Sequence, residues 1–160
     1  MLKIEKVWGT DREDWRAQAR ALWLRNRVLA DPARMEARSR QVVHGIFDRD
    51  ALVGVSTAEP IRVKLLNDHF FYEFRCFIDP AHRVPGLDVK LARQTFDTLE
   101  EQYRQGNSEC IGVITILEND ELRREKTWRR AVWPVINMVF VGYTTAGMPI
   151  RVYYFKGARI

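Results

Sequence analysis

Apolar and polar residues alternate from Leu2 to Trp8, and this period of two predicts a first β-strand that ends at Gly9. Residues 15–26 then follow helical spacing, with Thr10 or Asp11 as the expected N-cap. Proline at position 32 forces a break, so a second short helix is expected over 32–40.

From residue 42 the pattern changes to apolar runs rich in β-branched and aromatic residues. Residues 42–47 and 51–57 flank a short polar turn and predict a β-hairpin. Pro60 is expected to mark a bulge or an end of the second strand, with 61–65 extending it. Asn67-Asp68 is a turn, and the aromatic run 69–78 predicts a central strand.

The second half continues with a helix, a buried strand and a hairpin. Leu87 to Tyr103 has the apolar spacing of a helix of about five turns. Residues 110–117 predict a buried strand, and 118–131 predict a charged helix that Pro134 ends. Residues 135–143 and 150–155 are expected to pair as a terminal hairpin.

This order of elements predicts an α/β fold. We expect one domain over residues 1–160, with a mixed, mostly antiparallel sheet of about seven strands and about four helices, because no linker or repeat divides the chain. The strand-helix-strand segment from His69 to Leu117 requires one parallel pair with a right-handed crossover.

Composition narrows the class of protein. Hydrophobic residues make up 46% of the chain, enough for one core, and no apolar run approaches the ~20 residues of a membrane span. The first residues alternate in charge and do not resemble an export signal, so we expect a cytoplasmic protein. The scattered histidines and two cysteines argue against a metal site, and both cysteines are expected to be buried in strands.

The most informative segment runs from Ile78 to Leu91, where a strand leads through a Pro- and Gly-containing loop into a helix. Such a loop exposes backbone N–H groups beside a helix N-terminus, and both favour an anion such as a pyrophosphate. Gly86 allows the backbone to approach that anion closely. The net charge of +5 agrees with an anionic partner but does not identify one.

The segment and the order of elements resemble the GNAT superfamily of acyl-CoA N-acyltransferases over nearly the whole chain. Its coenzyme A signature is R/Q-x-x-G-x-G/A, often preceded by a proline three residues earlier, and Pro80, Arg83 and Gly86 match it in register. Leu91 matches a leucine of the following helix. Asp88 departs from the signature, since it stands at the last glycine position; it could repel a pyrophosphate or turn outward and cap the helix.

The resemblance implies that acetyl-CoA, or another acyl-CoA, is the co-substrate and that an amine attacks its thioester directly. The strand from Cys76 to Ile78 would pair with the pantetheine arm, and a backbone N–H there would stabilise the oxyanion. Asn119 would lie near the same arm. The implied donor-binding residues are Cys76, Phe77, Ile78, Arg83, Val84, Pro85, Gly86, Leu87, Asp88, Val89 and Asn119.

Three residues are candidates for the acid-base chemistry. Glu73 lies in an apolar run and is our first candidate base, since burial there would raise its pKa; it could equally face solvent or pair with Arg75 or Arg62. The tyrosine that many GNAT enzymes use as acid is not present at the matching place. Tyr143 and Tyr72 are the substitutes, although a buried tyrosine is more often a core residue.

The function expected from the resemblance is transfer of an acetyl or other short acyl group to an amine. An acyl-amino-acid or acyl-homoserine-lactone synthase, and a module that senses coenzyme A or binds nucleic acid without catalysis, stay open. The absence of a compact basic cluster in the sequence argues against nucleic acid. The C-terminal strands could pair between two copies as a homodimer.

Overall fold

The computed structural model describes residues 1–118 and 129–160 of the chain. Within these ranges the helices are α1 (Glu13–Arg25), α2 (Pro32–Ser39) and α3 (Leu87–Arg104), with short 3-10 turns at Lys64–Leu66 and Pro80–His82. The strands are β1 (Leu2–Lys6), β2 (Val42–Asp48), β3 (Ala51–Val63), β4 (His69–Ile78), β5 (Gly112–Ile116), β6 (Val132–Trp133), β7 (Met138–Tyr143) and β8 (Pro149–Tyr154).

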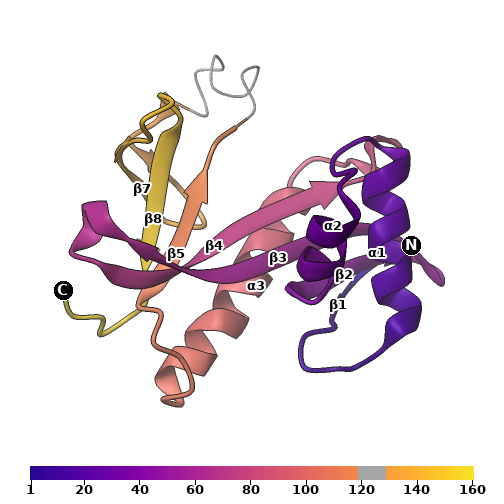
Figure 1. Cartoon of the computed structure of the whole chain (residues 1–160), viewed down its shortest axis with the longest axis horizontal. Coiled ribbons are helices and arrows are strands. Elements are labelled where there is room, and N and C mark those ends of the chain that lie inside the picture. The colour runs from indigo at the N-terminus through magenta and orange to yellow at the C-terminus, as the bar shows by residue number, and fades with distance from the viewer. Residues whose placement is uncertain (119–128) are drawn as a thin grey trace. The chain divides into compact units, whose positions relative to one another are not determined.

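The strands are ordered β1-β2-β3-β4-β5-β8-β7-β6 in one sheet (Figure 1). β4 and β5 are parallel, with Tyr72 opposite Val113 and Glu73 opposite Ile114. The pairs β1–β2, β2–β3, β5–β8, β8–β7 and β7–β6 are antiparallel. The expected α/β class and mixed, mostly antiparallel sheet are confirmed, including the one parallel pair around α3.

Within residues 1–118 and 129–160 the sheet has eight strands instead of about seven, because the two-residue strand β6 was not predicted. β7 begins at Met138 and not at Val135, since Val135 and Asn137 have φ angles of 72° and 53°, which belong to a turn. The helix predicted over 118–131 falls largely on residues 119–128, outside the described residues, and Ala131 itself is not helical.

The chain divides into two compact units. The first unit comprises Met1–Ala58 and Arg75–Thr95, and the second comprises Glu59–Phe74 and Phe96–Ile160. β3, β4 and α3 each contribute residues to both. The single domain expected over 1–160 remains a prediction.

The strands of the first unit carry an apolar cluster on each face. Neighbouring residues of β4 belong to different clusters: Phe77 packs with the helices α1 and α2, and Ile78 packs with α3. This alternation is the period of two that every β-strand has, because successive side chains point to opposite faces. Leu87 and Leu91 of α3 are buried against Ile78, so they fix the rotation of the first turns of α3 about its axis.

The second unit has its own core. Phe71 of β4 and Ile114 of β5 are buried with residues of β8, and Phe74 meets Phe96 edge to face at 5.2 Å. Gly112 is required here, since a Cβ at that position would lie 2.3 Å from the carbonyl oxygen of Tyr153. α3 therefore packs on β4 through apolar side chains of the segments in which the sequence predicted a helix and a strand.

Two local predictions are wrong, and a third is confirmed in part. α1 begins at Glu13 with Arg12 at the N-cap, since the Thr10 hydroxyl donates to the Val7 carbonyl (2.6 Å) and Asp11 pairs with Arg16. β3 continues through Pro60 to Val63, which confirms the expected extension and excludes an end at Pro60. Cys76 is exposed and only Cys110 is buried.

Candidate functional site

The loop between β4 and α3 is held at its start by Asp79. Its backbone N–H donates to the Val53 carbonyl (2.8 Å), and its carboxylate accepts from Ala81 N–H (3.1 Å) and from the Arg25 guanidinium (3.0 Å). These bonds lower the pKa of the Asp79 carboxyl, the Ala81 bond most. The loop therefore leaves the strand in a fixed direction before it reaches Gly86.

His82 strengthens the same anchor. Its imidazole nitrogens lie 3.7 Å from an Asp48 carboxylate oxygen and 4.0 Å from an Asp79 carboxylate oxygen. The residue is half-buried and lies near both carboxylates. It ties the loop to the end of β2.

Gly86 is the pivot of the loop. Its φ is +78°, a conformation that side chains rarely adopt, and the space where a Cβ would stand is open to 4 Å. The Leu87 N–H donates to the Val84 carbonyl (3.2 Å), and the Lys90 N–H donates to the Gly86 carbonyl (2.9 Å). The loop is thus a tight turn into α3 with an unobstructed surface.

Four backbone donors remain open at this turn. Within the part of the chain that the structure describes, no group accepts a hydrogen bond from the N–H of Val84, Gly86, Asp88 or Val89. The first turn of a helix always leaves such donors, and they attract anions together with the helix dipole. The geometry expected of a phosphate-binding loop is present.

Arg83 bends back on its own strand. Its Nε donates to the Ile78 carbonyl (2.9 Å), and its guanidinium lies 5.7 Å from the centre of the Phe77 ring. The residue remains exposed, so its terminal nitrogens are accessible while the bond to Ile78 restrains their position. Of the predicted donor-binding residues, Arg83 to Val89 lie together in this loop; Leu87 is buried and serves the core.

Asp88 lies in the first turn of α3 and not at the N-cap, because the helix begins one residue earlier at Leu87. Its carboxylate acts on Cys76 of β4, and the choice between repulsion of a pyrophosphate and an outward orientation stays a prediction. Desolvation raises the pKa of the Cys76 thiol to about 12, and the Asp88 charge adds to this rise while Arg83 opposes it. Cys76 is exposed, yet the surrounding protein desolvates its thiol and thereby disfavours the thiolate form.

The three catalytic candidates belong to the second unit. Glu73 is 8% exposed, which excludes the solvated face as its position. Tyr72 is 5% exposed and its hydroxyl shares a 2.7 Å hydrogen bond with Ser108 Oγ, while burial raises its pKa. This is the environment of a core tyrosine. Tyr143 is 64% exposed and meets Phe140 edge to face at 5.0 Å.

No family model and no curated protein matches the sequence. Solved structures do match. A GNAT family acetyltransferase from Brucella melitensis, in complex with acetyl-CoA, is 15% identical over 100% of this chain and 92% of that chain, with a TM-score of 0.56. The ribosomal-protein-alanine N-acetyltransferase of Escherichia coli is 13% identical over 99% and 97%, with a TM-score of 0.60. A GNAT family acetyltransferase from Streptococcus pneumoniae is 13% identical over 96% and 99%, with a TM-score of 0.57.

The chain has the GNAT fold. The resemblance of the sequence to that superfamily is confirmed at this level, and the segment from Ile78 to Leu91 is the strand, loop and helix that the signature predicted. Asn119, the remaining predicted donor contact, lies outside the described residues.

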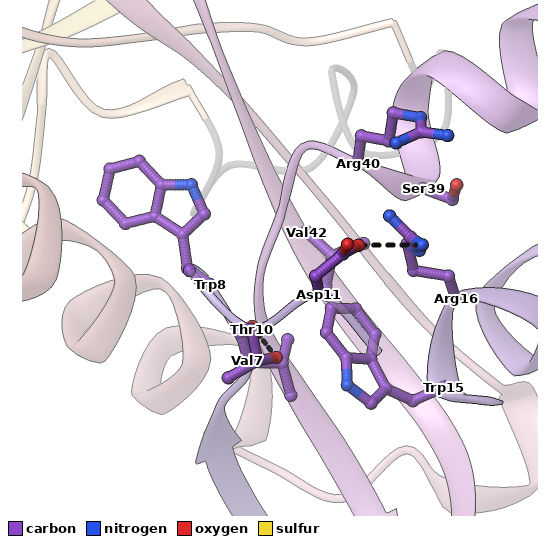
Figure 2. A pocket seen from close by; sticks show the side chains of 10 residues that line it. Val7, Trp8, Thr10, Asp11, Trp15, Arg16, Ser39, Arg40 and Val42 are labelled. Carbon is purple, nitrogen blue, oxygen red and sulfur yellow. Dashed lines mark hydrogen bonds and ion pairs between the residues drawn. The ribbon is translucent and has the colours of Figure 1, made fainter. Parts of the chain in front are cut away.

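This GNAT fold also has a hollow that the sequence did not indicate. It measures about 370 Å³ and belongs to the first unit (Figure 2). Arg16, whose side chain is 12% exposed, points toward Asp11 and pairs with it at 3.0 Å. The lining residues are Val7, Trp8, Gly9, Thr10, Asp11, Trp15, Arg16, Ser39, Arg40 and Val42.

The hollow is separate from the loop. It lies at Val42, where β2 begins, whereas the other end of β2, at Asp48, contacts His82 of the loop. A strand of this length spans about 20 Å, at roughly 3.3 Å per residue. Arg16 already forms ion pairs with Asp11 and Glu13, so its positive charge is neutralised and does not attract an anionic ligand into the hollow.

A buried polar network was also missed. The Thr95 hydroxyl of α3 donates to the Leu91 carbonyl (2.8 Å), and its oxygen contacts Ser56 Oγ (2.7 Å) and His44 Nδ1 (3.2 Å). The His44 backbone N–H donates to Ser56 Oγ (3.2 Å). The sequence did contain a hint of this network, since His44 and Ser56 are polar residues inside apolar strands. Their contact with each other and with Thr95 depends on strand register, which the sequence pattern does not give.

Among the described residues, no group of three His, Cys, Asp or Glu side chains is arranged to hold a metal ion. None of the described helices has the length and apolar character of a membrane span. Both findings apply to residues 1–118 and 129–160.

Proposed function

We propose that the chain transfers an acetyl or other short acyl group from acyl-CoA to an amine, with the diphosphate of the donor bound at the loop from Arg83 to Val89. The observation that carries this proposal is the set of open N–H donors of Gly86, Asp88 and Val89 beside the positive-φ glycine. Backbone donors at a helix N-terminus suit phosphate oxygens. Arg83 adds a positive charge at the same place.

The chemistry follows from the fold that the chain shares with acyl-CoA-dependent transferases. The pantetheine arm runs beside Cys76, Phe77 and Ile78, and a backbone N–H of this stretch stabilises the oxyanion as the amine nitrogen attacks the thioester carbonyl. The tetrahedral intermediate then collapses, the C–S bond breaks, and coenzyme A leaves as a thiol after taking up a proton. Acetyl-CoA is the proposed donor, and no metal takes part.

Glu73 is the proposed base that removes the proton from the attacking amine, directly or through a water molecule. Its support is its burial, since a carboxylate at 8% exposure is shielded from bulk water. Tyr143 is the preferred acid for the departing thiolate, because the residue is 64% exposed; Tyr72 is the weaker candidate, since Ser108 already engages its hydroxyl.

The first experiment is a calorimetric titration of the full chain with acetyl-CoA and with free coenzyme A at fixed moderate salt. Micromolar affinity for both supports the loop as the donor site. Amines are then screened by chromatography of the coenzyme A that is released. Absence of binding at millimolar ligand would refute the proposal.

The role of Glu73 is tested by Glu73→Gln, which keeps shape and hydrogen-bonding capacity while removing the charge. Turnover is expected to fall roughly hundredfold with donor affinity unchanged, because general-base catalysis contributes about 10²–10⁴ to rate. Glu101→Gln, an exposed acid of α3, is the matched control and should leave both unchanged. Equal turnover in Glu73→Gln and the parent would exclude Glu73 as the base.

A second candidate is a module that binds coenzyme A without transfer. The hydrogen bond that commits Tyr72 to Ser108 favours it, because it leaves one candidate acid fewer. Tight donor binding with no product across the amine screen would decide for this alternative.

A further inference from the structure

The first turn of α3 holds a carboxylate among open backbone donors. Asp88 is the second residue of the helix, and no described group accepts a hydrogen bond from its own N–H. Among the described residues, no Lys, Arg or His forms an ion pair with its carboxylate. A negative charge therefore stands at this turn without a cation to neutralise it.

The direction of the Asp88 side chain is set by its neighbours. Leu87 and Leu91 are buried against β4, so they fix the rotation of the helix, and Asp88 follows at the next position, about 100° further around it. The charge of Asp88 acts on Cys76 of β4, which agrees with a carboxylate that lies over the strand beside the loop. It is half-buried and does not extend freely into solvent.

The cations near this turn form no ion pair with the Asp88 carboxylate, although Arg83 opposes its effect on Cys76. Arg83 is bent back, with its Nε on the Ile78 carbonyl and its guanidinium against Phe77. Lys90 is exposed on the following turn. A phosphate group that reaches the open N–H donors must therefore approach a carboxylate of its own sign, and the helix dipole that would attract it is already partly compensated.

We propose that Asp88 is an affinity-setting residue of the loop, which weakens the binding of phosphate-bearing donors and products alike through charge repulsion. This inference rests on the proposed function. Because the reacting thioester is at the opposite end of the donor from its phosphates, the repulsion acts equally on the ground state and the transition state. It raises KM and speeds release of coenzyme A without lowering kcat.

The test compares the parent protein with Asp88→Asn and Asp97→Asn by calorimetric titration with acetyl-CoA at about 50 mM and about 150 mM salt. Asp97 is an exposed acid of the same helix, nine residues away and thus about 13 Å along its axis, beyond the Debye length at the higher salt. Asp88→Asn should bind roughly tenfold more tightly at the lower salt, with the gain shrinking as salt rises. Asp97→Asn should differ less than twofold from the parent.

A second readout separates repulsion from better folding. Asp88 stabilises the N-terminus of α3 through the helix dipole, so Asp88→Asn should melt slightly lower while it binds more tightly. Where turnover is measurable, its KM for acetyl-CoA should fall and its kcat should stay constant. An affinity equal to that of the parent, or an equal gain in Asp97→Asn, overturns the inference and leaves the proposed function standing. Absence of binding in both the parent and Asp88→Asn overturns the two together.

Discussion

The loop from Arg83 to Val89 and the buried network around Thr95 differ in how they use polar groups, although both involve the first half of α3. At the loop, four backbone N–H donors have no acceptor among the described residues. Two turns further along the helix, the Thr95 hydroxyl contacts Leu91, Ser56 and His44 at 2.7–3.2 Å. One region is open and the other is closed.

The difference separates groups that the fold requires from groups that a ligand can use. A buried polar group without a partner costs free energy, so the residues around Thr95 satisfy one another. The loop donors are at the surface, where water satisfies them at little cost and an anion can replace that water. Substitutions in the closed region should therefore change stability, and substitutions in the open region should change binding.

The largest expected effect is on the open region. Gly86→Glu should reduce acetyl-CoA affinity below detection, because its side chain would fill the space in front of the N–H donors and add a negative charge. Gly106→Glu is the matched control, since Gly106 at the other end of α3 has φ +77° and equally open space. Both variants bear the same backbone strain, and calorimetry should find normal affinity in Gly106→Glu. Loss of binding in both would mean that strain, not the loop, is responsible.

The sequence predicted those features of the fold that depend on residues close together along the chain. Periodicity predicted β1, the β2–β3 hairpin, β4, α3 and the C-terminal hairpin, because local spacing is fixed by which side chains face the core. It missed β6, since two residues carry no period, and it misplaced the start of β7, since turns with positive φ at Val135 and Asn137 leave no apolar pattern.

The candidate site could be proposed from the sequence where it is continuous along the chain, whereas its contacts between distant segments could not. The segment from Pro80 to Leu91 is local, so its glycine and its arginine could be recognised together. The direction of the Arg83 side chain and the meeting of His44 with Thr95 depend on strand register and on the rotation of α3. Neither is encoded by spacing within one element.

The next effect concerns pH and the closed region. Burial, with a smaller contribution from Lys6, lowers the pKa of His44 from 6.5 to about 4. Between these values the unfolded chain binds a proton that the folded chain does not, so the free energy of unfolding should fall as pH drops from 6.5 to 4 and should keep its full value above 6.5. The loss amounts to about 3 kcal/mol.

Denaturant unfolding at pH 7 and pH 4.5, on the parent and on His44→Gln, measures this effect. Carboxylates with lowered pKa values, such as Asp79, contribute to acid sensitivity in both proteins, so the difference between the two isolates His44. The variant should show a weaker dependence on pH. Identical slopes would mean that His44 is protonated in the folded protein at the lower pH.

The smallest expected effect comes from removing the Thr95 hydroxyl, which tests whether this group holds the buried network together. Thr95→Val keeps the shape of the side chain and removes the oxygen that contacts Ser56 and His44, so unfolding should require about 2 kcal/mol less free energy. Thr95→Ser keeps the oxygen and should be more stable than the valine variant, even though it removes a methyl group. Acetyl-CoA affinity, measured at a temperature where each variant is folded, should equal that of the parent in both. A valine variant that binds donor much more weakly would show that the loop depends on the network, and the division into an open and a closed region would then fail.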